Sequence, residues 1–429
     1  DLPMDVIFGK PPKMHRNVES RAIPARQLQI DASPDEALMR VLGHPAVASK
    51  AFLITIGDRS VGGQTARDQM VGPWQVPVAD VAVTTSGYQS RTGEAMAMGE
   101  RPPVALLNAA ASARLAVAES LTNIAAARID DLASVKLSAN WMAAVGHEGE
   151  DANLFDAVKA LGMDLCPALN ICIPVGKDSM SMQTRWQEAG VDKSVTAPMS
   201  VIITAFAPVL DVAETLTPEL RRVDGSRLLL VELSLARRLG GSMLAQCYGQ
   251  IGDVAPDLDD PAALKAMFDA LQNPAVRGQI LAYHDRSDGG LIATLAEMMF
   301  AGRQGVQIDA DSVGQDLLAW LFNEEPGAVL QVAGDNASAL VVQLKGAGLV
   351  CTDIGEVTPE QALRVVAGGS VVLDRTRVAL QTRWAAPGHQ IQRLRDNPTS
   401  ADEELAAIAD DDDPGLSARL TFEPSDAPV

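Results

Sequence analysis

Eight residues, YHDRSDGG at positions 283–290, combine two carboxylates, one base, one hydroxyl and a glycine pair immediately before the apolar run LIATLAEMMF. A segment of this kind is either a tight surface turn or an ion-binding edge at which a strand gives way to a helix. The N-terminus of the following helix would favour anions. Asp285 is a candidate cation ligand, and Asp288 is expected to cap the helix, with ligation by Asp288 as the alternative.

Further oxygen-bearing side chains stand elsewhere in the chain. The run AAASARLAVAESLTN predicts a helix that places Glu119 and Asn123 four residues apart on one face. Taken alone, they would be a polar pair facing solvent. Asp80 ends VPVAD among strand-forming residues, where a lone charge is costly to bury. Carboxylates drawn from separate elements are what a hard cation such as Mg²⁺ requires.

Two glycine-containing loops are candidate phosphate contacts. Residues 56–72, IGDRSVGGQTARDQMVG, include Gly57, Gly62 and Gly63, and residues 173–182, IPVGKDSMSM, form the second loop. Glycine lets the backbone approach a phosphate closely and turn its N–H groups toward it. Neither loop has Rossmann or P-loop spacing, and a β-hairpin turn explains the first equally well.

The cysteines give no sign of a catalytic or metal-binding thiol. Cys166, Cys172, Cys247 and Cys351 form no CxxC pair and have no zinc-ligand spacing. None stands in a GxCxG nucleophile elbow. We expect four buried, reduced thiols.

The elements that must position these residues alternate between short β-rich runs and amphipathic helices, which predicts an α/β or α+β fold. The expected strands lie in AFLITIG, VADVAVTT, EAMAMGERPPVALLN, VKLSANWM and SRLLLVELS, and near residues 171–186 and 197–210. The expected helices include SPDEALMRVLG, which Ser33 can cap, AAASARLAVAESLTNIAAARI and DANLFDAVKALGMDLCPAL.

Composition divides the chain into four expected segments. Residues 1–49 form a Pro-rich connector with a short helix, and residues 50–210 and 211–375 form two α/β domains. Residues 376–429 form a terminal strand and helix followed by the acidic run ADEELAAIADDDDPG. Such runs are usually solvated linkers.

Length and charge exclude several classes of protein. The 429 residues suit two or three domains, and no apolar run reaches the roughly 20 residues that span a bilayer. The net charge of −20 disfavours nucleic acid, although a nucleotide can still bind where Mg²⁺ separates carboxylates from phosphates. The chain begins DLPMDVIFGK without Met or a signal peptide, so we expect a cytoplasmic piece of a longer protein.

In the order of its motifs the chain resembles the large, single-chain family of phosphoribosylformylglycinamidine synthase, also called formylglycinamide ribonucleotide amidotransferase. The motifs are GKPPKM, IGDRSVGGQTARDQMVGPWQVPVAD, GEAMAMGERPPVALL, ESLTNIAA, KLSANWMAA, PVGKDSMSM, HDRSDGG, FNEEPG and RLRDNP. The resemblance implies the second half of a two-half synthetase core, ending before a C-terminal glutaminase domain. Each half resembles aminoimidazole ribonucleotide synthetase, in which the sheet of the first α/β domain joins that of a partner.

The resemblance also implies a reaction. ATP would activate the amide oxygen of formylglycinamide ribonucleotide, and ammonia from glutamine would replace that oxygen to give formylglycinamidine ribonucleotide, a step of purine synthesis. Partners would be the first half of the core and the glutaminase domain. Two other interpretations stay open: a non-catalytic nucleotide-binding half, and a stand-alone kinase of the same superfamily. We also expect the exposed sheet to allow a homodimer.

By motif match the resemblance assigns residues to an auxiliary site that binds ADP and Mg²⁺. The implied Mg²⁺ ligands are Asp80, Glu119, Asn123 and Asp285, and the implied nucleotide neighbours are Ala79 and Ser287. Lys50 resembles a lysine directed toward the reacting site, although a lysine snorkelling from a strand end is an equal alternative. The loop that contains Gly57, Gly62 and Gly63 would reach the ATP of the other half.

Overall fold

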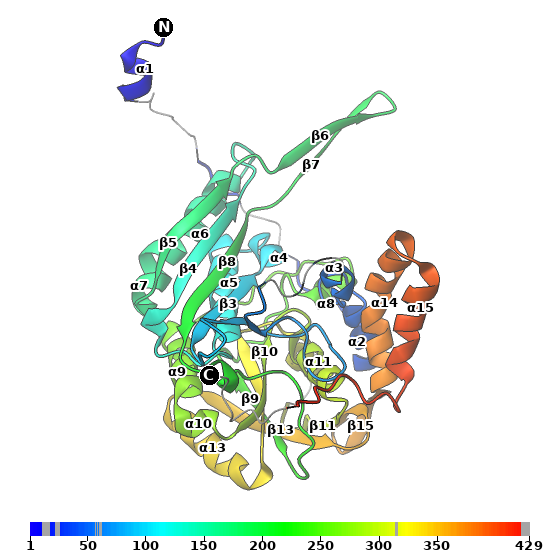
Figure 1. The fold of residues 1–429 in the computed structure, drawn as a ribbon. Helices are drawn as coiled ribbons and strands as arrows, with labels where there is room; N and C mark the ends of the chain where they lie inside the picture. The colour runs from blue at the N-terminus through cyan, green and yellow to red at the C-terminus, as the bar shows by residue number, and fades with distance from the viewer. Residues whose placement is uncertain are drawn as a thin grey trace.

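The computed structural model describes residues 1–10, 18–21, 26–55, 57, 59, 62–313 and 316–421. These residues form two mixed α/β domains, each built around one large β-sheet (Figure 1). The expected α/β, two-domain fold is confirmed. Among the described helices, none is both long enough and apolar enough to cross a lipid bilayer.

The first domain contains a six-stranded sheet in which β4 and β5 are parallel and the other neighbouring strands are antiparallel. In sheet order the strands are β1 (Thr65–Arg67), β2 (Ala82–Thr85), β3 (Gly93–Glu100), β8 (Ser200–Val209), β4 (Lys136–Met142) and β5 (Cys172–Ser179). Side chains of β3 alternate between buried and exposed. One face of the sheet therefore packs on helices, and the described chain leaves much of the other face exposed.

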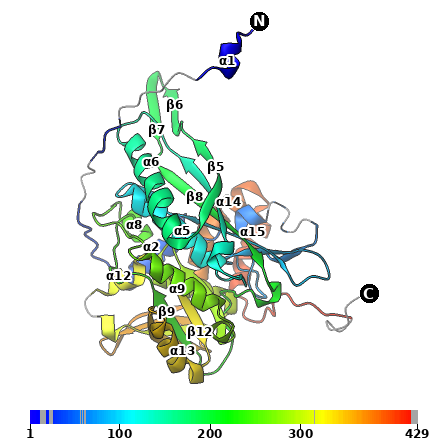
Figure 2. The same ribbon diagram turned by 90° about the vertical axis from the view of Figure 1, so that its left-hand side faces the viewer.

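Helix α5 (Ala109–Ile124) covers the packed face of this sheet (Figure 2). The side chain of Asn108 caps it by accepting the Ala111 amide at 2.9 Å. Gly99 of β3 lets the helix approach, because a Cβ there would lie 2.2 Å from the carbonyl oxygen of Ala116. The other helical segments here are α4 (Pro102–Ala105), η1 (Leu132–Ser134), α6 (Glu150–Lys159), the π-helical η2 (Ala160–Leu165) and α7 (Cys166–Leu169).

The second domain contains a seven-stranded sheet in which only β11 and β14 are parallel among the described strands. In sheet order these are β10 (Ile280–Arg286), β12 (Gly327–Val332), β9 (Arg227–Glu232), β13 (Val350–Thr358), β11 (Gly305–Asp309), β14 (Ala362–Ala367) and β15 (Ser370–Thr376). Helices cover both faces, so successive residues of β9 pack into opposite cores: Leu229 into one and Leu230 into the other. This explains the continuous apolar run in RLLLVE.

The second domain also contains several helical segments. They are η3 (Val212–Glu214), α8 (Met243–Cys247), α9 (Pro261–Gln272), α10 (Pro274–Arg277), α11 (Gly290–Gly302), η4 (Asp311–Val313), α12 (Leu317–Phe322) and α13 (Gly334–Gly346). Helix α11 is buried over almost its whole length. It is the apolar run that follows YHDRSDGG.

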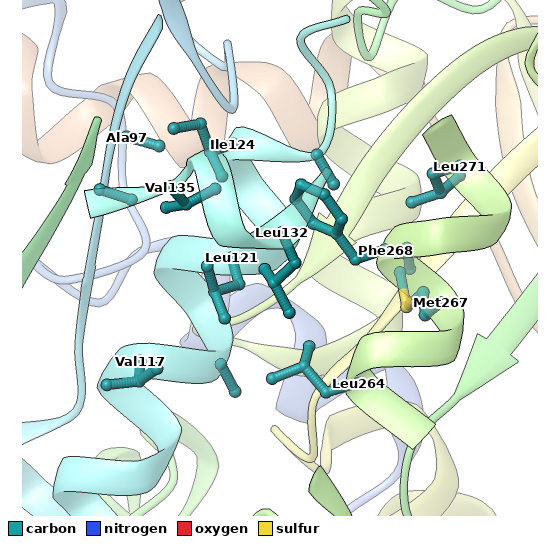
Figure 3. Close-up of a cluster of buried hydrophobic side chains, with 14 of the residues drawn as sticks. Ala97, Val117, Leu121, Ile124, Leu132, Val135, Leu264, Met267, Phe268 and Leu271 are labelled. Atoms are coloured by element: carbon teal, nitrogen blue, oxygen red, sulfur yellow. The ribbon is translucent and has the colours of Figure 1, made fainter. Parts of the chain in front are cut away.

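An apolar core joins the two domains. Figure 3 shows Leu121 and Ile124 of α5 on one side of this core and Leu264 and Phe268 of α9 on the other. All four side chains are at most 1% exposed. The two domains therefore share one packed interior, which holds the polar residues beside it at fixed positions.

Segments from both ends of the chain flank the second domain. They are α2 (Pro34–Leu42), α3 (Ala51–Ile54), α14 (Arg377–Arg395), α15 (Pro398–Ala406) and η5 (Ala407–Ala409), while α1 (Met4–Phe8) lies away from the body (Figure 1). The predicted cap of α2 is confirmed, because Ser33 Oγ accepts the Glu36 amide at 3.2 Å.

The prediction of a strand in AFLITIG is wrong, because the described residues of this run contain helix α3. The run has no strand neighbour to pair with among the described residues, and Leu53 is 53% exposed. It lies instead beside α14, where Arg395 Nη1 donates to the carbonyl oxygen of Phe52 at 2.5 Å. Lys50 accordingly precedes a helix and not a strand.

The single strand expected at residues 171–186 is two strands, and the second loop candidate is mostly strand. Its residues Gly176, Lys177, Asp178 and Ser179 belong to β5 and pair with β4. Strand β6 (Gln183–Glu188) then turns through Ala189 and Gly190, both with positive φ, into β7 (Val191–Thr196). Alanine is unusual at such a position, so the sequence lacked the usual hairpin signal.

Two smaller expectations also need correction. Cys172 is exposed and Cys247 partly exposed, although all four thiols are free. The acidic run is not a free linker where it is described, because Asp411 pairs with the buried Arg377 at 2.7 Å and the carbonyl oxygen of Asp413 accepts Trp74 Nε1 at 3.0 Å. The positive charge of Arg377 and the N–H donor of Trp74 therefore hold the acidic run against the rest of the protein.

Candidate metal centre

Asp80, His284 and Asp285 meet where the two domains touch, and their ligand atoms lie within 4.8 Å of one another. Asp80 comes from the segment before β2, and the other two residues come from β10. Asp80 Oδ1 lies 2.6 Å from His284 Nδ1, and that nitrogen lies 3.9 Å from Asp285 Oδ1. The two aspartate side chains are 1% and 4% exposed. Two of the predicted ligands thus form one buried cluster.

The backbone around Asp285 explains the opening motif. The carbonyl oxygen of Asp285 accepts Thr294 Oγ1 at 3.1 Å, which ties β10 to helix α11. The chain turns between them through Gly289 and Gly290, with φ of 88° and 72°, a conformation that favours glycine. A Cβ on Gly290 would also lie 2.7 Å from the backbone of Phe322. YHDRSDGG is therefore a buried strand-to-helix edge and not a surface turn.

The side chain of Asp80 indicates that a cation could bind at this edge. Its Oδ2 is buried and has no hydrogen-bond partner among the described residues, whereas its Oδ1 faces His284. An unpaired buried carboxylate oxygen is costly, and a hard cation bound by oxygen would offset that cost. The buried oxygens of Asp80 and Asp285 therefore fit Mg²⁺.

Glu119 lies beside the cluster on α5. Its Oε2 accepts the backbone amide of Glu100 at 2.8 Å, and Thr122 of the same helix places Oγ1 3.5 Å from Asp285 Oδ2. Gly99 permits this arrangement because α5 crosses β3 at that residue. The group of atoms within 4.8 Å does not include Glu119. Its assignment as a ligand stays a prediction.

Asn123 occupies the next turn of α5 and is turned toward β3. Its Nδ2 donates to the carbonyl oxygen of Met98 at 2.9 Å, which leaves Oδ1 as the atom that can bind a cation. Asn123 is half-buried, unlike the two aspartates. Ligation by Asn123 also stays a prediction.

Arg101 links the two domains beside these acids. It follows β3 in the first domain, and its guanidinium pairs with Asp288 and, at 2.7 Å, with Glu324 of the second. Asp288 therefore does not cap α11 as expected. Helix α11 has no side-chain cap within the described part of the chain, and Glu324 Oε1 instead accepts the amide of Gly289, the residue before the helix, at 2.8 Å.

Burial and mutual repulsion shift the protonation of the cluster. Burial, followed by the charge of Asp80, raises the pKa of Asp285 to about 8. Burial also raises the pKa of Glu119 well above its usual value, against the opposing effect of Arg101. Burial lowers the pKa of His284, but Asp80 and Glu297 outweigh it and the net pKa is raised well above its usual value. The site collects negative charge that a proton or a cation must balance.

Lys50 points its ammonium group at backbone oxygens in this structure. Its Nζ donates to the carbonyl oxygens of Ala46, at 2.9 Å, and Ala48. Burial lowers its pKa, while the charges of Glu297 and Asp288 act in the opposite direction. Lys50 is thus partly buried near the acidic groups, and its catalytic role stays a prediction.

The remaining predicted nucleotide contacts occupy two places. Ser287 shares a small cavity with Arg101, Glu119 and Arg286, so it lies beside the acidic cluster. Ala79 precedes Asp80 in the chain, and its amide donates to the carbonyl oxygen of Gln69 at 3.3 Å.

The three predicted loop glycines lie in the segment before β1. Gly62 and Gly63 have φ of 76° and 71°, and Tyr88 donates its hydroxyl to the carbonyl oxygen of Gly62 at 2.7 Å. A Cβ added at Gly57 would meet no described atom within 4 Å. Four residues of this loop, 56, 58, 60 and 61, lie outside the described residues.

Sequence reasoning missed His284, Glu297 and Arg101 as parts of this site. His284 Nε2 lies 3.0 Å from Glu297 Oε2 of α11. A signal for Glu297 was present, since it is the single charged residue in LIATLAEMMF. Nothing in the sequence pointed to Arg101, because its partners are about 190 and 220 residues away.

A larger cavity lies elsewhere on the molecule. It has a volume of about 230 Å³ and is lined by α14, α15 and aromatic residues that include Phe52, Trp74 and Trp384. No residue of the acidic cluster lines it. The candidate centre is therefore identified by buried charge and not by cavity size.

Comparison with known protein families gives two adjacent matches. Residues 49–208 match the FGAR-AT PurM_N-like domain, and residues 223–368 match the C-terminal domain of AIR synthase related proteins. Asp80 and Glu119 lie in the first matched region, and His284 and Asp285 lie in the second. The centre is therefore built at the junction of the two matched domains.

Solved structures with a similar fold include PurL proteins. T. maritima PurL complexed with FGAR is 14% identical, with a TM-score of 0.59, over 81% of this chain and 53% of that chain. PurLQS from Thermotoga maritima is 13% identical, with a TM-score of 0.56, over 82% and 51%. T. maritima PurL complexed with ATP is 14% identical, with a TM-score of 0.51, over 81% and 49%. The chain spans about half the length of these structures, and such identities establish the fold alone.

Proposed function

We propose that this chain is the second half of the synthetase core of a phosphoribosylformylglycinamidine synthase. The chain joins a region similar to the FGAR-AT PurM_N-like domain to one similar to the C-terminal domain of AIR synthase related proteins. The whole enzyme would use ATP and glutamine to convert formylglycinamide ribonucleotide to formylglycinamidine ribonucleotide in purine synthesis. This half would hold an auxiliary ADP with Mg²⁺. The first half of the core and a glutaminase domain would be its partners.

The observation that carries this proposal is the buried acidic cluster at the domain junction. Asp80 comes from the first matched domain and Asp285 from the second, and Asp80 Oδ2 has no partner among the described residues. Two carboxylates held this close repel each other unless a cation neutralises them. A cation-linked nucleotide would therefore bind both domains at once.

Different residues would contact the cation and the nucleotide. Asp80 and Asp285 would bind Mg²⁺, with Glu119 and Asn123 completing the oxygen set, and Ser287 and Ala79 would lie next to the nucleotide. When bound, Mg²⁺ supplies positive charge that offsets the nucleotide phosphates. Arg101 pairs with Glu324 and Asp288, and its positive charge opposes the rise in the pKa of Glu119 that burial and the neighbouring carboxylates cause.

A second interpretation is a nucleotide-binding half with a structural role only. The exposed sheet face of the first domain favours it, because a face that needs a partner fits a chain that works only in a larger assembly. Lys50 distinguishes the two, since a catalytic role for Lys50 requires that this half contribute to the chemistry.

The test combines binding and turnover. Calorimetry should detect Mg²⁺-dependent ADP binding by this chain, and amidine formation from ammonia should appear only after the first half is added. Lys50→Met in the reconstituted enzyme should abolish turnover but leave ADP binding intact if this half takes part in chemistry. Unchanged turnover would favour the structural role, and absence of Mg²⁺–ADP binding would contradict the proposed site.

A further inference from the structure

His284 stands between two carboxylates that come from different domains. Its Nδ1 faces Asp80 Oδ1 at 2.6 Å, and its Nε2 faces Glu297 Oε2 at 3.0 Å. Asp80 belongs to the first domain, while His284 and Glu297 belong to β10 and α11 of the second. One ring therefore contacts both carboxylates, one through each nitrogen.

This bridge, together with the backbone amide of Asp285, which donates to Asp80 Oδ1 at 3.4 Å, leaves Oδ2 as the available oxygen of Asp80. His284 occupies Oδ1, and the buried Oδ2 is left without a partner among the described residues. A carboxylate held by one oxygen cannot rotate freely, so its second oxygen keeps a fixed direction. Groups that orient a ligand in this way raise the affinity of metal sites.

Glu297 holds the ring in turn. It is the charged residue of an otherwise buried helix, and its side chain is 20% exposed against 8% for His284. Thr294, one turn earlier in α11, holds the backbone of Asp285. The same helix therefore fixes Asp285 directly and Asp80 through His284.

We propose that His284 is a positioning residue that, braced by Glu297, orients Asp80 of the other domain toward a divalent cation. This inference rests on the proposed Mg²⁺ site. It explains how the second domain fixes the orientation of Asp80, a proposed ligand that belongs to the first domain. His284 acts through Asp80 and does not itself bind the cation.

Two substitutions separate the two contacts of the ring. In His284→Asn the side-chain amide nitrogen stands near the place of Nδ1, so the contact to Asp80 is kept and that to Glu297 is lost. In His284→Gln the amide nitrogen stands near the place of Nε2, and the contact to Asp80 is lost. His389 offers matched controls, because its Nε2 pairs with Asp402 at 2.8 Å in the α14–α15 pair.

The measurement is Mn²⁺ binding to the full chain, with and without ADP, followed by the paramagnetic resonance of free Mn²⁺. We expect His284→Gln to weaken binding about 10- to 100-fold, and His284→Asn to weaken it by only about threefold. Glu297→Gln, which keeps an acceptor for Nε2, should cost less affinity than Glu297→Ala. His389→Asn and His389→Gln should bind like the wild type.

The outcomes separate this role from the site itself. Equal Mn²⁺ affinity for wild type, His284→Gln and His284→Asn would overturn the positioning role alone. Nitrogen coupling from a directly bound imidazole in the wild-type spectrum would also overturn it, since His284 would then be a ligand. A wild-type chain that binds neither Mn²⁺ nor Mn²⁺–ADP would overturn both the role and the proposed centre. Unfolding midpoints identify any variant that has lost its fold.

Discussion

The ligand role proposed for Glu119 would come at a cost to the stability of the empty protein. It is a buried acid with a strongly raised pKa beside other acids. We expect Glu119→Gln to weaken Mg²⁺–ADP binding about tenfold or more, while the free energy of unfolding without ligand stays the same or rises. Calorimetry and denaturation in chelator check the two effects.

The control for that substitution is Glu94→Gln, which alters an exposed residue of the same sheet. Asn123→Ala should weaken binding less than Glu119→Gln, because a neutral amide oxygen contributes less to a hard cation than a carboxylate. Mg²⁺–ADP affinity that is unchanged in Glu119→Gln would contradict its assignment as a ligand.

The protonation of Asp285 makes the stability of the metal-free protein depend on pH. Its folded pKa of about 8 lies above the unfolded value, so the folded state binds the proton more tightly. Stability is then fully present below the unfolded pKa and is lost as pH rises through the folded pKa. Urea unfolding in chelator should therefore show a lower free energy at about pH 8 than at about pH 5, and Asp285→Asn should flatten the dependence.

If the proposed site is correct, Mg²⁺ should reverse this trend, because it would bind the deprotonated carboxylates. The rise in unfolding midpoint caused by Mg²⁺ and ADP should be larger at the higher pH. A metal-free protein whose stability increases over this range would show that the buried acids are ionised and already balanced.

At the scale of secondary-structure elements, helices α5 and α9 form much of the apolar junction between the two domains. Phe268 of α9 is 1% exposed and faces α5 across the shared core (Figure 3). Phe268→Ala should lower the free energy of unfolding by about 3–5 kcal/mol. It should also weaken Mg²⁺–ADP binding, because the proposed ligands Asp80 and Asp285 come from different domains.

Phe155→Ala is the matched control, since Phe155 of α6 is 62% exposed. It should change stability by less than about 0.5 kcal/mol. Denaturation curves followed by tryptophan fluorescence provide the measurement. Equal effects of the two substitutions would mean that the apolar junction contributes little to stability.

At the scale of the whole molecule, the outer face of the first sheet exposes apolar side chains. Met96 of β3 and Phe206 of β8 are cross-strand partners and are 39% and 40% exposed, and Met98 is 55% exposed. Exposed apolar surface drives association. We expect this chain by itself to form a symmetric homodimer through this face.

Sedimentation velocity tests that expectation. Phe206→Glu should shift the dimer to monomer, whereas Val371→Glu, at an exposed position of β15 in the other domain, should not. A wild-type chain that remains monomeric at high micromolar concentration would contradict it.

Much of this architecture followed from the sequence because it depends on local patterns. Apolar spacing predicted α5 and β9, and Ser33 predicted the start of α2. Ordered motifs predicted the pairing of two α/β domains. Local patterns failed where a segment had no strand partner among the described residues and packed beside a distant helix, as α3 does beside α14, or where a turn used an unusual residue, as in the β6–β7 hairpin.

The sequence by itself determined the types of residue available at the candidate centre: carboxylates at 80, 119 and 285, and a strand-to-helix turn with two glycines. Only the tertiary structure decided that Asp80 and Asp285 share one buried cluster, that His284 and Glu297 brace it, and that Arg101 takes Asp288 away from the helix cap. The physical reason is that burial and pairing between distant segments arise when two domains pack on one core. No window of sequence contains both partners of such a contact.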